Sequence, residues 1–374
     1  MTKQERKIYS LIKENPSISQ KEIAEILNLT RAAVAVHISH ITEKGYILGR
    51  QYIVKKNKQV LVIGACNVDM QGFANDNFEL YNSNMGKIKI TFGGVGRNIA
   101  VNLNKLCKNT KMLTVLSKDK NGIEVLNDLI RNQINVEDIL TVNENMSTYL
   151  SIFNTNSEMI AAISDMGIIK NLSVEYLKTK EDLIKKAEII VIDTNIPKDS
   201  IEYIASKINS KAKLIVDTVS IEKASKINGI LDKITVLKTN KLELEAIAGV
   251  SLNKVTDIKK AAIELLKKGV KKIFVTLGPD GLVYGDINKL VKISSPKKIE
   301  VVDVNGAGDI FTSALIYAEN LNLSLGKMAK FAQSAAIFKL SKLGTSPEDF
   351  SLNSIKEVAK KHFPEISKGD FFYE

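Results

Sequence analysis

Hydrophobic residues follow two alternating patterns from about residue 58 onward. Short apolar runs predict buried strands at residues 60–65, 111–116, 189–193, 214–217, 235–238 and 272–276. Between these runs, apolar residues at helical spacing predict helices at residues 122–131, 173–186, 199–208 and 256–268. Strands that alternate with helices predict an α/β fold with a doubly wound, mostly parallel sheet.

Two segments depart from this rhythm. Residues 71–92 and 148–162 alternate in character, and the runs 87–92, 149–153 and 159–163 predict strands. We expect these strands to form a small second sheet beside the main one.

The first 54 residues have a pattern of their own. Apolar spacing predicts a helix within residues 3–14, Ser19 and Glu22 form the capping box of a second helix, and Thr30 caps a third. Short strands are expected at residues 45–48 and 51–54. The expected buried face of the third helix comprises Ala33, Val34, Ile38, Ile41 and, in part, Val36. The charged segment 55–58 separates a first domain, residues 1–54, from a second, residues 55–374.

Three helices followed by a hairpin resemble a winged helix-turn-helix domain. The resemblance implies a DNA-binding face on the third helix and a wing tip at Arg50, and the helix residues on or near that face are Arg31, Ala32, Ala35, His37 and Ser39. The first 50 residues carry eight Lys or Arg against five Glu, a net charge of +3, which is modest for binding phosphates. The alternative is a helical domain for dimerisation or for contact with the rest of the chain.

The segment 301–309 combines an apolar start, a glycine-rich turn and Asp309, and the apolar run 310–318 then predicts a buried helix. Glycines at a helix entrance let backbone N–H groups converge on an anion, and the helix dipole adds to the attraction. A carboxylate would repel a bound phosphate, but it has a purpose if it takes a proton from a hydroxyl that attacks phosphorus. The alternative is an Asp that only complements the helix dipole.

Residues 303–316 resemble the C-terminal signature of the ribokinase-like (PfkB) sugar and nucleoside kinases. Residues 93–100 are similar to the N-terminal signature of that family, and Cys107 is a departure from it. The resemblance covers about residues 58–350. It implies a ribokinase-like fold, a lid formed by the second sheet, and phosphoryl transfer from ATP with Mg²⁺. Asp309 would be the general base, and the backbone of Gly306, Ala307 and Gly308 would stabilise the moving phosphoryl group.

On the sugar side, the resemblance implies that Asp69 accepts hydrogen bonds from sugar hydroxyls and that Asn98 faces the sugar. Two carboxylate oxygens suit a ribose diol, because both hydroxyls can donate to them. Asn67 lies beside Asp69 at the end of the first strand of the main sheet, and Gly93 and Gly94 let the backbone pass close to the ligand. Asp165, just past the lid strands, is a further sugar-site candidate or an ordinary turn residue.

On the nucleotide side, the resemblance implies that Asn240 lies near the phosphates and that Glu243 organises Mg²⁺ through water. The alternative for this pair is a helix N-cap with Glu243 at its third position. Asn195, Asp217 and Thr218 end strands, where they would either line the cleft or cap helices. The resemblance also places Thr276, Gly278 and Gly281 at the nucleotide, residues 332–340 beside the adenine, and Asp303 as the first candidate ligand of a monovalent cation such as K⁺.

The bulk composition narrows the class of protein. The chain has 374 residues, a net charge of +11 and two cysteines, Cys66 and Cys107, both in apolar contexts. We expect reduced thiols, a cytoplasmic location, no signal peptide and no membrane span. Polyanions are plausible partners, although Lys-rich solvated helix faces account for the same charge. We also expect a homodimer.

The substrate is narrowed by a further resemblance. A winged helix fused to a kinase, together with the segments 162–166 and 193–195, looks like the pseudouridine kinase branch of the family. We therefore expect a nucleoside, pseudouridine first, followed by inosine, guanosine or ribose. Fructose 6-phosphate ranks lower because the lid lacks an obvious cationic pair. A DNA-binding regulator with a kinase-like sensor domain is the alternative function, but the intact loop 306–309 argues against an inactive kinase.

Overall fold

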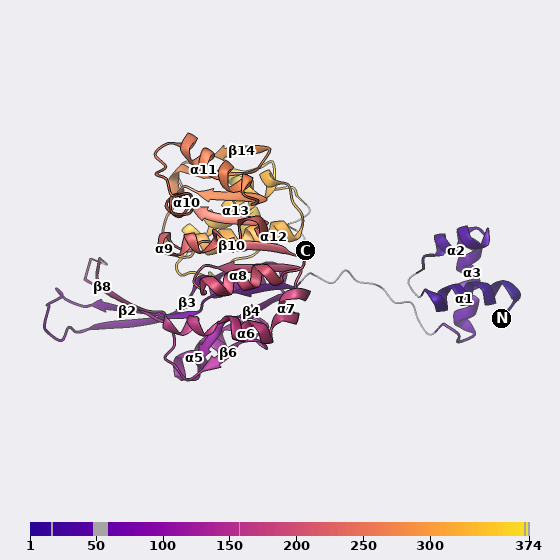
Figure 1. Cartoon of the computed structure of the whole chain (residues 1–374), viewed down its shortest axis with the longest axis horizontal. Helices are drawn as coiled ribbons and strands as arrows, with labels where there is room; N and C mark the ends of the chain where they lie inside the picture. The colour runs from indigo at the N-terminus through magenta and orange to yellow at the C-terminus, as the bar shows by residue number, and fades with distance from the viewer. Residues whose placement is uncertain (16–17, 48–58, 157, 370–371, 373–374) are drawn as a thin grey trace. The chain divides into compact units, whose positions relative to one another are not determined.

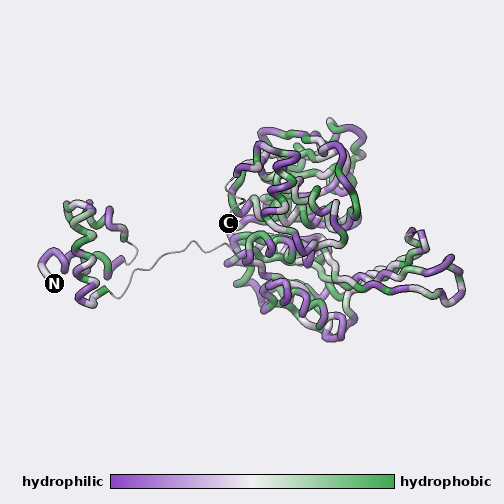
Figure 2. Tube along the Cα trace, turned by 180° about the vertical axis from the view of Figure 1, so that it is seen from behind, coloured by the Kyte–Doolittle hydropathy of each residue, from purple (hydrophilic) through white to green (hydrophobic). Residues whose placement is uncertain are grey.

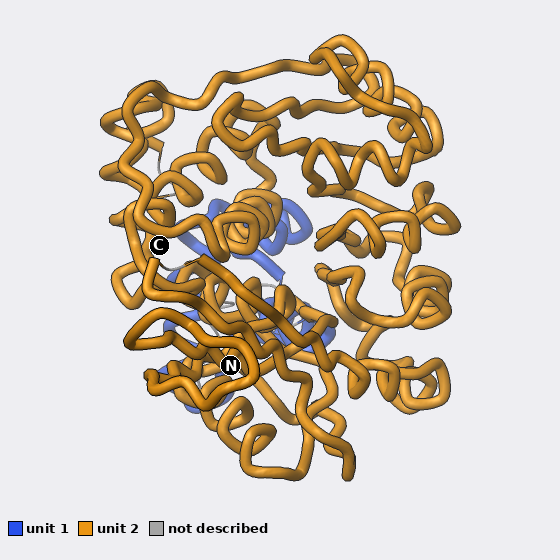
Figure 3. The backbone as a smooth tube through the Cα atoms, turned by 90° about the vertical axis from the view of Figure 1, so that its left-hand side faces the viewer, with its two compact units in different colours: residues 1–56 blue, residues 57–374 orange. Residues whose placement is uncertain are grey.

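The computed structural model describes residues 1–15, 18–47, 59–156, 158–369 and 372. The chain divides into two compact units, Met1–Lys56 and Asn57–Glu374, which are distinguished in Figure 3. No helix among the described residues is long and apolar enough to cross a membrane. Both cysteines are buried, and neither forms a disulfide among the described residues.

The first unit contains helices α1 (Lys3–Glu14), α2 (Gln20–Leu27) and α3 (Arg31–Glu43). The predicted capping box of Ser19 and Glu22 starts α2, and Thr30 caps α3. The core of this unit consists of Ile8, Ile23, Ala24, Val34, Ile38 and Ile41.

Two details of the first unit differ from the sequence prediction. Val36 is 53% exposed, because it lies two positions from both Val34 and Ile38, about 200° around the helix from each, which turns it to the opposite side. Residues 45–47 form a turn and a bend instead of the start of a strand. The rest of the predicted hairpin, with Arg50, lies outside the described residues.

The second unit contains an eight-stranded sheet in the order β14-β13-β12-β11-β10-β9-β1-β4. The strands from β12 to β4 are parallel to their neighbours, and β13 and β14 add an antiparallel edge. This confirms the predicted mostly parallel α/β sheet. The bounds are β1 Val60–Ile63, β4 Thr110–Leu113, β9 Ile189–Asp193, β10 Lys213–Asp217, β11 Val236–Asn240, β12 Lys272–Thr276, β13 Leu282–Asp286 and β14 Lys289–Ile293.

Helices cover both faces of this sheet, because each central strand is apolar on both sides. In β1, Val60 and Val62 pack into one core, whereas Leu61 and Ile63 pack into the other. The first core is covered by α4 (Val95–Cys107), α5 (Lys120–Arg131), α12 (Ala307–Asn320), α13 (Leu325–Leu340) and α14 (Leu352–His362). The second is covered by α6 (Val174–Thr179), α7 (Glu181–Lys186), α8 (Lys198–Lys207), α9 (Ile221–Ala224), α10 (Lys241–Ala248) and α11 (Val255–Lys267).

Two predicted elements are divided in the structure. The strand expected at residues 111–116 is split into β4 and β5 (Val115–Ser117), and β5 pairs with β6 (Leu140–Val142). The helix expected at residues 173–186 breaks at Lys180 into α6 and α7.

The predicted second sheet has four strands in the order β3-β2-β7-β8 and extends away from the main sheet in Figure 1. Its strands are β2 (Asn67–Ala74), β3 (Gly86–Gly93), β7 (Thr148–Phe153) and β8 (Met159–Asp165). This lid is larger than expected, since Asn67 and Asp69 belong to β2 and Asp165 ends β8. Figure 2 shows hydrophobic as well as hydrophilic residues along the extended strands.

Candidate active site

The centre of the site is the turn that leads into α12. Gly306 is the N-cap of α12 and has a left-handed backbone with φ of 77°, and no side chain caps this helix start. A Cβ at Gly306 would lie 2.8 Å from Thr345 Cα, so both the backbone angle and the space require glycine. The first turn of α12 therefore begins with backbone N–H groups that can face an anion.

Asp309 lies in the first turn of α12 beside Asn98 of α4. The Asn98 side chain donates a hydrogen bond from Nδ2 to Asp309 Oδ2 at 2.8 Å. Burial and the nearby Asp217 carboxylate raise the pKa of Asp309 to about 7, against the opposing effects of Asn98 and Lys238. Such a carboxyl group exchanges protons near neutral pH, which suits a general base.

A second charged pair lies directly beside this turn. Lys238, in the middle of β11, has its ammonium group 3.1 Å from Asp217 Oδ2, and Thr312 Oγ1 donates to the same oxygen at 2.7 Å. A Cβ at Gly308 would lie 3.1 Å from Lys238 Nζ, so a buried ammonium group adjoins the loop. Burial alone would lower the pKa of Lys238, but Asp217, Glu243 and Asp309 raise it above its ordinary value.

The sequence analysis assigned Lys238 only to a strand. The available signal was a lysine within an otherwise apolar strand, where an unpaired charge would be costly. Its partner Asp217 ends the neighbouring strand β10, and the sequence analysis left that residue undecided between cleft and cap. The structure places Asp217 in the charged cluster.

The predicted sugar-side residues meet where the start of β2 pairs with the end of β3. The Asn67 amide donates from Nδ2 to Asp69 Oδ1 at 2.6 Å, and any Cβ at Gly93 would collide with the Asp69 carboxylate. Gly94 has φ of 98° and starts α4. Burial raises the pKa of Asp69. Asp165 is exposed and pairs with Thr148, so two strands separate it from β3.

Arg97 is a buried residue that the sequence analysis missed. Its Nη2 lies 2.6 Å from Asp128 Oδ2, and its Nη1 donates to Asn98 Oδ1 at 3.0 Å. Thr345 Oγ1 donates to the same amide oxygen at 3.1 Å. These two donors fix the orientation of the Asn98 amide, so that its Nδ2 points to Asp309.

Asn240 and Glu243 form the capping box of α10. The Asn240 side chain accepts from Glu243 N at 2.9 Å, and Glu243 Oε2 accepts from Asn240 N at 2.9 Å. Thr218 Oγ1 also donates to Glu243 Oε2 at 2.5 Å. The capping interpretation of this pair is thus confirmed. Both carboxylate oxygens of Glu243 already accept hydrogen bonds, so Glu243 would hold Mg²⁺ only through intervening water. This arrangement fits a hard cation that is held mainly by nucleotide phosphates.

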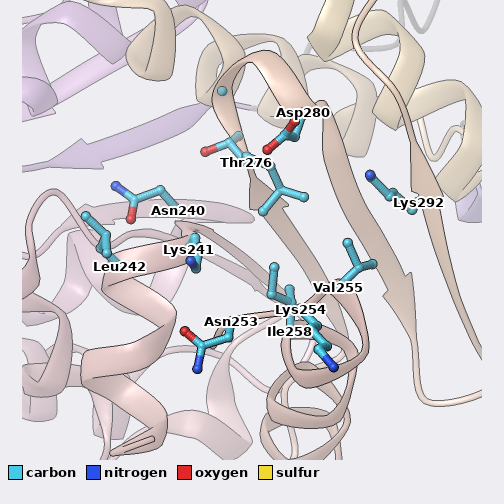
Figure 4. A pocket seen from close by; sticks show the side chains of 12 residues that line it. Asn240, Lys241, Leu242, Asn253, Lys254, Val255, Ile258, Thr276, Asp280 and Lys292 are labelled. Atoms are coloured by element: carbon cyan, nitrogen blue, oxygen red, sulfur yellow. The ribbon is translucent and has the colours of Figure 1, made fainter. Parts of the chain in front are cut away.

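One pocket is lined in part by this loop, and a second pocket shares lining residues with the first. An apolar cavity of about 490 Å³ is lined by residues that include Gly281, Ala307, Gly308, Phe311 and Gln333. Gln333 Oε1 is buried there without a hydrogen-bond partner among the described residues. A second cavity of about 310 Å³, shown in Figure 4, is lined by Asn240, Lys241, Lys254 and Lys292 among others. Thr276 and Gly278 line both cavities, so the predicted nucleotide residues meet here.

Asp303, the predicted ligand of a monovalent cation, is surrounded by other partners. Its Oδ1 accepts from Asn305 N at 2.9 Å and its Oδ2 from Gly344 N at 3.0 Å. The ammonium group of Lys339 lies 2.9 Å from the Asp303 carbonyl oxygen and 3.6 Å from Oδ2. K⁺ therefore does not fit beside Asp303, because an ammonium ion already faces these oxygens.

In the first unit, Arg31 and Ala32 are exposed at the start of α3, whereas His37 is half-buried with a buried Nδ1. His37 and His40 lie close to the buried Glu5 of α1 with the spacing of metal ligands. Lys44 Nζ already pairs with Glu5 Oε2 at 2.8 Å, which opposes a further cation.

Comparison with known proteins supplies the remaining findings. Residues 57–350 match the pfkB family carbohydrate kinase model, and residues 1–47 match a winged helix-turn-helix DNA-binding model. A pseudouridine kinase of Escherichia coli (strain K12) is 33% identical over 303 residues, covering 81% of this chain and 96% of that protein. An uncharacterized sugar kinase of the same organism, YeiI, is 32% identical over 339 residues, covering 90% and 93%.

Solved structures extend this likeness to the fold. The ribokinase of Arabidopsis thaliana, complexed with ribose and ATP, matches with a TM-score of 0.72 at 22% identity. The match covers 81% of this chain and 99% of that structure.

Proposed function

This chain belongs to the pfkB family of carbohydrate kinases, and from that premise we propose that it transfers the γ-phosphoryl group of ATP to the 5′-hydroxyl of a nucleoside, pseudouridine first. The observation that carries the proposal is the environment of Asp309. This carboxyl group has a pKa of about 7 and lies in the glycine-led first turn of α12, beside a buried ammonium.

The proposed reaction uses this turn directly. Asp309 takes the proton of the 5′-hydroxyl, the hydroxyl oxygen forms a bond to the γ-phosphorus, and the bond to the β–γ bridging oxygen breaks to release ADP. The backbone N–H groups of Ala307, Gly308 and Asp309 stabilise the charge on the transferred group. The ammonium group of Lys238, which lies beside Gly308, adds a positive charge next to this turn.

The other site residues have supporting roles in this proposal. Asp69, with Asn67, accepts hydrogen bonds from the ribose diol, while Gly93, Gly94 and Asn98 shape and orient the sugar. The cavity that contains Gln333 receives the base of ATP, and Thr276, Gly278, Gly281 and Asn240 adjoin its phosphates. Glu243 would hold Mg²⁺ through water, and the bound ion would supply positive charge against the phosphates.

Fructose 6-phosphate remains a second candidate substrate because of one observation. Lys87 and Lys89 lie on the face of β3 that also carries Thr91, which pairs with Asp69. The sequence analysis saw no obvious cationic pair in the lid, whereas the alternation of β3 places these two lysines on one face.

The test is a substrate panel with ATP consumption as the readout. We expect turnover of pseudouridine above that of inosine, guanosine and ribose. Fast turnover of fructose 6-phosphate with none of nucleosides would reverse this order. No turnover of any of these compounds, with ATP still bound, would contradict a kinase and favour a ligand sensor.

We also propose that the first unit binds DNA through the exposed start of α3. The match to a winged helix-turn-helix DNA-binding model and the exposure of Arg31 and Ala32 support this proposal. Gel shifts with DNA from upstream of the gene, at increasing salt and with or without nucleoside, provide the test. Arg31→Ala should weaken binding, whereas Lys21→Ala, on α2, serves as a control of equal charge change. Equal binding by wild type and the Arg31 variant would contradict the assigned face.

A further inference from the structure

We propose that the ammonium group of Lys339 permanently fills the position beside Asp303 where a monovalent cation would bind, so that the kinase works without K⁺. The inference rests on the proposed function for its meaning in catalysis. Its structural part, a tethered cation that excludes a free one, stands on the contacts of Lys339.

The side chain of Lys339 is fully buried in the last turn of α13. Its Nζ donates to the carbonyl oxygens of Asp303 at 2.9 Å and of Lys342 at 3.0 Å. The Asp303 carboxylate oxygen Oδ2 lies 3.6 Å away as the counter-charge. Carbonyl and carboxylate oxygens of this kind are the ligands that replace the water shell of K⁺ in proteins.

The position of this group matters because it joins two segments at the active-site loop. Asp303 lies three residues before Gly306, and Val302 N donates to Leu340 O at 2.7 Å. Gly344 N donates a hydrogen bond to Asp303 Oδ2, and the next residue, Thr345, packs against Gly306. Lys339 therefore fixes the segment 302–306 against the segment 340–345, and these two segments support the start of α12.

A buried lysine at this position is otherwise hard to explain. Burial of an ammonium group is costly, and an apolar side chain at the end of α13 would avoid this penalty. If the adjoining loop binds a triphosphate, the positive charge of Lys339 attracts the phosphates in addition to the dipole at the start of α12. A second cation among the same oxygens would be repelled at close range.

The first test is a cation series with the full-length wild-type protein. Turnover of the best nucleoside is measured in KCl, NaCl and choline chloride at constant ionic strength. We expect equal rates in all three salts. Strong activation by KCl over choline chloride would overturn the inference, and this measurement does not depend on any variant.

The second test compares two substitutions. Lys339→Ala removes the ammonium and opens space, whereas Lys339→Met removes the charge but fills the space. We expect both to lower kcat by about tenfold or more, and only the alanine variant to be restored by KCl or ammonium chloride. Lys360→Ala, which removes an exposed side chain paired with Glu357 on α14, is the matched control and should behave as wild type. A fully active alanine variant that ignores all cations would overturn the inference.

A third readout does not require activity. Thermal unfolding should show that KCl stabilises Lys339→Ala more than choline chloride does, with no such difference for wild type. If no substrate is turned over but this pattern holds, the proposed function fails and the tethered cation stands. If K⁺ selectively stabilises the wild type, the cation site is open and the inference fails.

Discussion

The surroundings of α12 and the surface of the lid depart from the usual distribution of residues in opposite ways. Near the start of α12, four charged residues are buried where apolar side chains would be usual: Asp193, Asp217, Lys238 and Glu243. In the lid, Ile88, Ile90 and Ile163 are exposed, with between 56% and 76% of each residue accessible. Departures of this kind concentrate at functional sites.

The two departures have different physical consequences. Buried charges interact strongly and change each other's protonation, as shown by the raised pKa of Asp309, about 7, and of Asp193, about 6. In both cases burial is the first cause. Exposed apolar residues do not titrate, but they favour contact with another surface. The first region is therefore equipped for chemistry and the second for association.

Asp309→Asn should have the largest effect on activity. Loss of the base should reduce kcat by about 10²- to 10⁴-fold, while ATP binding is retained, as measured by ATP consumption and calorimetry. Asp199→Asn, on the exposed start of α8, is the matched control. Near-normal kcat of the Asp309 variant on the best substrate would contradict the assigned base.

The same variant should become more stable above neutral pH. The pKa of Asp309 is raised from 3.8 to about 7 in the folded chain, so ionisation is disfavoured there and stability is lost as pH rises through this interval. An amide avoids that loss. We expect Asp309→Asn to unfold about 6 °C above wild type near pH 8 and at nearly the same temperature near pH 4. A lower melting temperature at both pH values would contradict the burial of this charge.

Lys238→Met tests the charged cluster from its positive side. Asp217 would be left buried without its partner, which should destabilise the protein by about 3–5 kcal/mol. Removal of a nearby positive charge should also raise the pKa of Asp309, so the acid limb of the kcat/KM profile should move to higher pH. The double variant Asp217→Asn/Lys238→Met should recover part of the stability. An unchanged pH profile in a folded single variant would show that Lys238 does not act on Asp309.

Arg97→Lys should have a smaller effect on the same profile. Lysine retains the charge beside Asp128 but cannot donate to both Asp128 and the Asn98 oxygen in the same geometry. A less fixed Asn98 amide should stabilise ionised Asp309 less, which moves the acid limb to higher pH and lowers kcat by about tenfold. Arg131→Lys, on the exposed end of α5, is the control. A change in KM alone would favour a purely sugar-positioning role.

The features that could be predicted from the sequence are those coded by neighbouring residues. The turn at Gly306, the capping boxes at Ser19 and Asn240, and the alternation of strands with helices each depend on residues a few positions apart. Repulsion between buried carboxylates, by contrast, is set by the fold. No local pattern indicates that Asp217 would raise the pKa of Asp309.

Three of the buried basic residues were missed or left unassigned for the same reason. The paired residues are far apart in the sequence: Lys238 and Asp217 are separated by 21 positions, Arg97 and Asp128 by 31, and Lys339 and Asp303 by 36. In the sequence each is one more basic residue in a chain rich in lysine. Only the packing of strands and helices brings each to its partner. The sequence analysis therefore expected K⁺ at Asp303 and left Lys339, whose ammonium group faces the Asp303 oxygens, within a helix.

The lid should respond to substitution in the opposite way to the cluster. Strand pairing places Ile88, Ile90 and Ile163 on one face of the sheet with Met70 and Leu150. We propose that this face joins two copies of the chain, in line with the expected homodimer.

The double variant Ile88→Lys/Ile163→Lys should be monomeric by light scattering, with a KM raised by a few-fold and little change in unfolding temperature, because these side chains are already exposed. Ile123→Lys, on an exposed part of α5, is the matched control and should leave the dimer intact. A monomeric wild type, or a dimer that survives the double substitution, would remove this face from the interface. Loss of kcat with unchanged KM and an intact dimer would instead show that the exposed isoleucines act on the catalytic turn, and the separation between the two regions would fail.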